Sequence, residues 1–134
     1  LLIVVAVIGI IAAIAVPNLV QSRLAANEAS AISSVRTVVT AQLTFAATNS
    51  TGNYAADLAT LQGQGLIDQA LGSGQKDGYN FVTAGAGQTF TITATPVTAG
   101  TTGNRGFFSD ETAVIRWGDG AANAASPPLG QAAP

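Results

Sequence analysis

Few side chains in this sequence could carry out acid–base or covalent chemistry. It has seven acidic and five basic residues, and it has neither histidine nor cysteine. The commonest general base and metal ligand is therefore missing, and so is all thiol and disulfide chemistry. Asp57, Asp68 and Asp77 have no nucleophile or base at a spacing that suggests a catalytic pair. We therefore expect a protein that is not an enzyme.

A group of carboxylates near the C-terminal end could bind a metal ion. Asp110, Glu111 and Asp119 offer oxygen ligands of the kind that Ca²⁺ prefers, although Ca²⁺ needs several of them. Carboxylates in a turn are more often simply solvated, so both interpretations stay open. We expect no other metal and no cofactor.

The charges give no electrostatic reason to expect a nucleic-acid partner. The formal net charge is −2, and charged residues make up 9% of the chain. Nucleic-acid binding needs clustered basic residues. Here the basic residues are scattered, at Arg23, Arg36, Lys76, Arg105 and Arg116. Glu28 lies two helical turns from Arg36, too far for an ion pair along one helix, so we expect Glu28 to be solvated or paired between subunits.

The most prominent element of the sequence is the N-terminal run Leu1–Val20, which is apolar and uncharged. Twenty helical residues span about 30 Å, enough to cross the hydrocarbon core of a bilayer. A helix in a soluble core usually keeps a polar face, and a signal peptide has a basic segment before its apolar run. Residues 1–22, the apolar segment, are therefore expected to form a membrane-resident helix, with a signal peptide and a core helix as alternatives.

Gly9 and Pro17 weaken the apolar segment as a helix. Pro17 has no backbone N–H, so the Ala13 carbonyl loses its partner in the helix. Gly9 leaves helical geometry more easily than any other residue. The segment between them is expected either to bend slightly or to unwind and lengthen.

The helix is expected to continue as an amphipathic half over residues 23–48. Its apolar residues recur at spacings of three and four, which predicts one buried stripe formed by Ile32, Val35, Val39, Leu43 and Ala46. The two halves together predict one helix about 70 Å long. The second half can pack on a globular head (residues 23–134) while the apolar segment projects.

The rest of the head is expected to be mainly β-structure. Residues 49–77 form a connecting region with two short helical turns, and residues 118–134 form an irregular tail. Between them, residues 78–117 alternate with a period of two, which predicts three to four antiparallel strands with a turn at Ser109–Thr112. The inward side chains are expected to be Tyr79, Phe81, Thr83, Phe90, Ile92 and Ala94. Phe107, Phe108 and Trp117 are expected to be core residues too.

Residues 1–18, Leu-Leu-Ile-Val-Val-Ala-Val-Ile-Gly-Ile-Ile-Ala-Ala-Ile-Ala-Val-Pro-Asn, resemble the N-terminal segment of type IV pilins and of the related type II secretion pseudopilins almost residue for residue. The resemblance implies an α+β, type IV pilin-like fold, with one long N-terminal helix packed on a small antiparallel sheet. Members of that family begin with a methylated residue and carry a glutamate at the fifth position. This sequence opens just after that glutamate, so we expect about five residues and a leader to precede it.

The resemblance also implies a structural function. Such subunits are stored in the inner membrane of a bacterium and then extracted by the pilus assembly machinery into a homopolymeric helical filament at the extracellular surface. The expectation is a major pilin, and the alternative is the major pseudopilin of a type II secretion system. An anchored binding module and an anchored enzyme are the alternatives from other classes. The side chains expected in the filament core are Leu1, Leu2, Ile3, Val4, Val5, Val7, Ile8, Ile10, Ile11, Ile14, Val16, Leu19 and Val20.

Overall fold

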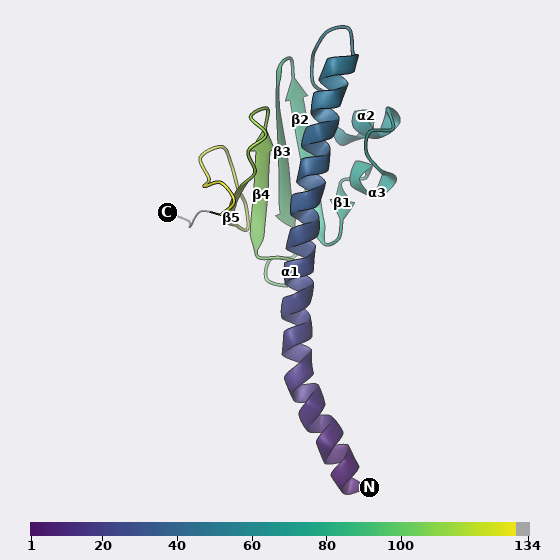
Figure 1. The fold of residues 1–134 in the computed structure, drawn as a ribbon, viewed down its shortest axis with the longest axis vertical. Coiled ribbons are helices and arrows are strands. Elements are labelled where there is room, and N and C mark those ends of the chain that lie inside the picture. The colour runs from purple at the N-terminus through teal and green to yellow at the C-terminus, as the bar shows by residue number, and fades with distance from the viewer. Residues whose placement is uncertain (131–134) are drawn as a thin grey trace.

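The computed structural model describes residues 1–130, except the side chain of Pro17. Its long helix α1 runs from Leu2 to Thr48 without interruption. The upper half of α1 lies against the sheet, and the lower half projects well beyond the head with a gentle bend (Figure 1). The expected division into a free apolar half and a packed amphipathic half is therefore what the structure has.

Within residues 49–130, two short helices and five strands follow α1. In chain order they are α2 (Leu58–Gly63), α3 (Gln69–Gly72), β1 (Gln75–Lys76), β2 (Tyr79–Ala86), β3 (Thr89–Pro96), β4 (Arg105–Asp110) and β5 (Arg116–Asp119). Neighbouring strands are antiparallel and pair in sequence order. The α2–α3 segment lies on one side of α1, and β5 lies on the other (Figure 1).

The α+β prediction is confirmed, but the sheet has five strands rather than three to four. The additional strand is β1, which lies in the expected connecting region. Asp77 and Gly78 have φ values of 49° and 79°, so they form a tight two-residue turn that folds β1 back on β2. Two residues are too few for a period of two to be recognised in the sequence, and for that reason β1 was not predicted.

The last two strands lie a few residues from where the sequence predicted them. Ser109 and Asp110 belong to β4 rather than to a turn, and β5 begins at Arg116 rather than Ala113. The Ser109 hydroxyl is buried and donates to the Val114 carbonyl, 3.0 Å away. The polar residue Ser109 suggested a turn. In the structure its hydroxyl is hydrogen-bonded locally, so Ser109 can lie buried within a strand.

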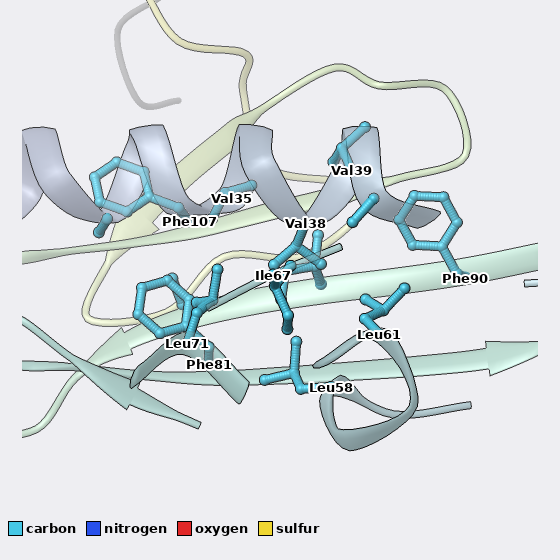
Figure 2. Close-up of a cluster of buried hydrophobic side chains, with 14 of the residues drawn as sticks. Val35, Val38, Val39, Leu58, Leu61, Ile67, Leu71, Phe81, Phe90 and Phe107 are labelled. Atoms are coloured by element: carbon cyan, nitrogen blue, oxygen red, sulfur yellow. The ribbon is translucent and has the colours of Figure 1, made fainter. Parts of the chain in front are cut away.

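The core lies between α1 and the sheet. Figure 2 shows Val35, Val38 and Val39 of α1 facing Phe90 and Phe107 of the sheet. A second group closes the core from the connecting region and comprises Leu58, Leu61, Ile67 and Leu71. Tyr79, Phe81, Thr83, Phe90, Ile92 and Ala94 are all buried, as the alternation predicted.

The buried stripe of α1 agrees with the predicted one at Val35 and Val39 but differs from it elsewhere. Small or polar residues, Ala31, Ser34 and Gln42, are buried, whereas Leu43 is 43% exposed. The prediction counted mainly large apolar residues, so it missed the short and polar side chains that are buried here. Leu43 lies on the outer side of the helix.

Candidate assembly surface

The apolar segment is the surface most open to a partner. Every described side chain of residues 1–22 is exposed, and the large ones range from 48% exposed at Val20 to 102% at Leu1. By length and composition this part of α1 could cross a membrane. All the residues expected in a filament core lie on this surface, namely Leu1, Leu2, Ile3, Val4, Val5, Val7, Ile8, Ile10, Ile11, Ile14, Val16, Leu19 and Val20.

Gly9 and Pro17 lie inside an unbroken helix in the single subunit. A Cβ added at Gly9 would meet no atom within 4 Å, so no contact within the described chain requires a glycine there. The unwinding expected between Gly9 and Pro17 concerns the assembled state, and it stays a prediction.

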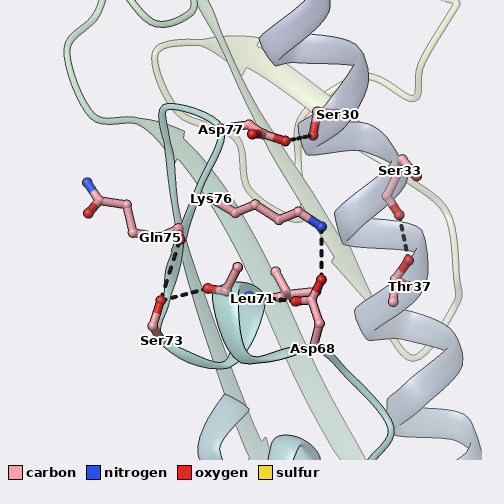
Figure 3. A network of polar contacts seen from close by, with 10 residues as sticks. Ser30, Ser33, Thr37, Asp68, Leu71, Ser73, Gln75, Lys76 and Asp77 are labelled. Atoms are coloured by element: carbon pink, nitrogen blue, oxygen red, sulfur yellow. Dashed lines mark hydrogen bonds and ion pairs between the residues drawn. The ribbon is translucent and has the colours of Figure 1, made fainter.

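The boundary between the free and packed halves of α1 is fixed by contacts from three parts of the head. Leu24 is the first buried side chain of the helix. One turn later, the Asn27 amide donates to the Thr102 carbonyl at 2.9 Å. The Ser30 hydroxyl donates to the Asp77 carboxylate in the turn between β1 and β2 (Figure 3). The helix is therefore held from Leu24 onward and free before it.

Glu28 forms the strongest of these boundary contacts. Its Oε2 lies 3.1 Å from the Arg105 Nε, and its Oε1 accepts hydrogen bonds from the backbone N–H groups of Asn104 and Arg105. The Glu28 side chain is only 14% exposed. The prediction that Glu28 is solvated or paired between subunits is therefore wrong. Its partner lies so far along the chain that no local spacing could have revealed it.

Tyr79 contacts the same junction through the backbone of Arg105. Its hydroxyl donates to the Arg105 carbonyl at 2.6 Å, and its ring is fully buried beside Phe107. Burial, helped by the nearby Glu28 charge, raises the pKa of Tyr79 to about 12. Tyr79 therefore stays neutral at physiological pH and serves as a hydrogen-bond donor rather than as an acid or base.

The other carboxylates with clear partners have structural roles. Asp57 and Asp68 each cap a short helix, accepting hydrogen bonds at 2.8 Å from the N–H groups of Thr60 and Leu71. These backbone hydrogen bonds lower the pKa of both carboxyl groups, and Lys76, 3.3 Å from Asp68, adds to the effect there (Figure 3). Asp57 also accepts from the Thr60 hydroxyl at 2.8 Å, a local contact within the same helix cap.

The three candidate calcium ligands are not brought together. Asp110 ends β4 and accepts from the Thr112 N–H. Asp119 lies opposite Arg105 in the strand register, at the other end of the β4–β5 pair. Five residues of strand separate those ends by about 17 Å. Glu111 lies beside Asp110, but its carboxylate accepts from the Phe90 N–H at 3.4 Å. Within residues 1–130 no three acidic side chains are grouped as a metal would require, so these residues do not fit a calcium site.

No protein-family model, curated protein or solved structure matches this chain. What the protein does has to be inferred from its own residues. They combine an exposed apolar helical segment with a folded, weakly charged head that is tied to the helix from Leu24 onward.

Proposed function

We propose that this protein is a structural subunit, a major pilin that polymerises through its apolar segment into an extracellular type IV pilus filament. The observation that carries the proposal is the exposure of every described side chain of residues 1–22 on a helix that projects from a folded head (Figure 1). The resemblance of residues 1–18 to the pilin N-terminal segment supports it independently. Before assembly the same segment holds the subunit in the inner membrane.

The hydrophobic effect explains why the apolar segment needs either lipid or other copies around it. Each large apolar side chain removed from water contributes roughly 1.5–3 kcal/mol. The side chains of the apolar segment are exposed in the single subunit, so a released subunit with no cover would be insoluble. Side-by-side packing of the segments buries them without lipid. Head-to-tail contacts that do not close on themselves then produce a helical fibre.

Cryo-electron microscopy of filaments sheared from cells that make the full-length protein tests the proposal. We expect a helical polymer with the apolar segments at its axis and the heads outside. Ile8→Asp, which places a charge in the apolar segment, is expected to abolish filaments, whereas Val82→Asp, at an exposed position on the sheet, is expected to leave them intact. Wild-type protein that stays monomeric when detergent is removed, and is absent from the sheared fraction, would contradict a pilin and indicate an anchored binding module.

The alternative within the same family is the major pseudopilin of a type II secretion system. Calcium-dependent folding of the head, or filaments seen only on overexpression, would favour this alternative. The separation of Asp110 from Asp119 across the β4–β5 pair gives it no support. Thermal unfolding of the full chain with calcium or with a chelator distinguishes the two, and for a pilin we expect the same midpoint in both conditions.

A further inference from the structure

A groove on the head is open beside the packed half of α1. It has a volume of about 470 Å³ and lies between α1, the loop that follows β4, and the C-terminal end of the described chain. Its apolar lining comes from Val39 and Leu43 of α1, Val114 and Ile115 of the loop, and Leu129. Arg36 is the charged residue in this lining.

The groove presents apolar side chains to the outside. In the described part of the head, four large apolar residues are exposed, at Leu43, Val82, Val97 and Val114, and two of them line this groove. Local backbone geometry holds Val114 there. Ala113 has φ of 63°, an uncommon conformation for alanine, and Ile115 is buried just beyond it. The loop therefore turns Val114 outward, while Ile115 beside it is anchored in the core.

The occupant best suited to this groove is the apolar segment of a second copy. That segment is uncharged and exposed, and it needs an apolar surface to cover it. The chain's own segment cannot reach the groove. On a continuous α1, Ile14 lies about 33 Å along the axis from Arg36. A second copy displaced along the helix by that distance brings its Ile14 beside the groove.

Arg36 adds a polar contact to the fit between the groove and the apolar segment of a second copy. Its side chain makes no ion pair or hydrogen bond to residues 1–130 and lies at the groove. In a neighbouring copy, the Ala13 carbonyl has no helical donor because Pro17 lacks an N–H group. A carbonyl without a partner in apolar surroundings is costly, and a guanidinium carries five N–H donors.

We propose that the groove formed by Val39, Leu43, Val114, Ile115 and Leu129 receives the apolar segment of a second copy, with Arg36 donating to that copy's free Ala13 carbonyl. This inference rests on the proposed filament function and specifies which face of the head contacts the neighbouring helix. It makes the contact heterologous, because the groove and the segment are different surfaces of the same chain.

Cross-linking tests the contact directly, because the chain contains no cysteine. Cells would co-express one copy carrying Val114→Cys and another carrying Ile14→Cys, and sheared filaments would be treated with a short bis-maleimide. We expect a covalent dimer from this pair and none when Val82→Cys replaces Val114→Cys. Val82 is 63% exposed but lies on the sheet, away from the groove, so it is a matched control. Equal dimer yields from the two pairs would overturn the proposal.

Assembly of groove variants provides the second test. Val114→Asp and Leu43→Asp are expected to reduce sheared filaments at least tenfold, and Val82→Asp is expected to have no effect. Arg36→Ala is expected to reduce filaments several-fold, and Arg36→Lys to restore part of the loss. Thermal unfolding midpoints within a few degrees of wild type would show that these heads fold. Groove variants that assemble like the wild type overturn the groove and leave the pilin function standing, whereas wild-type protein that never assembles overturns both.

Discussion

The Glu28 carboxylate of α1 and the Arg105 guanidinium of β4 are paired across the junction at which the helix leaves the head, with 3.1 Å between Oε2 and Nε. Arg105 also lies over the rings of Phe107 and Trp117, with its Cζ 5.4 Å and 5.6 Å from their centroids. One side chain of the sheet is thus held by a charge from the helix and by two aromatic rings. The contact therefore fixes α1 to the sheet close to the point at which the helix leaves the head.

Glu28→Ala is expected to lower the free energy of unfolding by about 2–3 kcal/mol, because it leaves the Arg105 guanidinium and two backbone N–H groups without an acceptor. Urea unfolding of the full chain in detergent, followed by the fluorescence of the single tryptophan, measures the change. Lys76→Ala is the control, because the Lys76–Asp68 pair is more exposed and is expected to contribute less than about 1 kcal/mol. Equal losses from both variants would contradict a special role for Glu28.

Gln42→Leu is expected to cost about 2–3 kcal/mol. The buried Gln42 amide accepts from the Ala55 N–H at 2.8 Å and donates to the Ala55 carbonyl at 3.0 Å, so it joins α1 to the connecting region as a backbone strand would. Leucine leaves both backbone groups unsatisfied. Gln88→Leu, at an exposed position in the β2–β3 turn, is expected to change stability by less than about 0.5 kcal/mol in the same urea experiment.

Gly85→Ala is expected to destabilise the head by about 1–3 kcal/mol, because a Cβ at Gly85 would overlap the Ala55 carbonyl oxygen where the connecting region crosses β2. Gly63→Ala, with nothing within 4 Å of the added Cβ, serves as the control and is expected to be neutral. The thermal unfolding midpoints of the two variants show whether the loss comes from the overlap with the Ala55 carbonyl or from replacing any glycine with alanine.

Alkaline pH is expected to destabilise the protein through Tyr79. Its pKa is about 12 in the folded chain, against about 10 in an unfolded one. The contribution of this group is therefore fully present below pH 10 and is lost as pH rises toward 12, by roughly 2–3 kcal/mol in total. The ultraviolet absorbance of tyrosinate follows the titration. Tyr79→Phe is expected to remove the component near pH 12, and its persistence in that variant would assign the titration elsewhere.

Gly9→Ala and Pro17→Ala are expected to slow amide hydrogen exchange between residues 9 and 17 in assembled filaments. Alanine favours the helix by about 1 kcal/mol over glycine and about 3 kcal/mol over proline. The wild-type segment is expected to be partly non-helical in the filament and to let the fibre stretch. A wild-type filament map with unbroken helical hydrogen bonds from Leu1 to Ala47 would refute this prediction.

Local patterns in the sequence predicted much of the fold. The uncharged run Leu1–Val20 predicted an apolar helix that projects from the head, and the alternation from Tyr79 to Ala94 predicted which side chains of β2 and β3 are buried. These features depend on neighbours a few residues away, because helical and strand periods place nearby side chains on one face. A sequence read by itself contains that information.

The tertiary structure decided what depends on contacts between distant residues. It pairs Glu28 with Arg105, buries Gln42 against Ala55, and leaves Leu43 and Val114 facing one groove. Each of these outcomes depends on how far α1 is rotated and shifted against the sheet. Packing of the whole core sets that rotation and shift, and no local period in the sequence encodes them. The sequence alone predicted that the apolar segment projects from the head, whereas only the tertiary structure determined which apolar side chains of the head lie exposed in one groove.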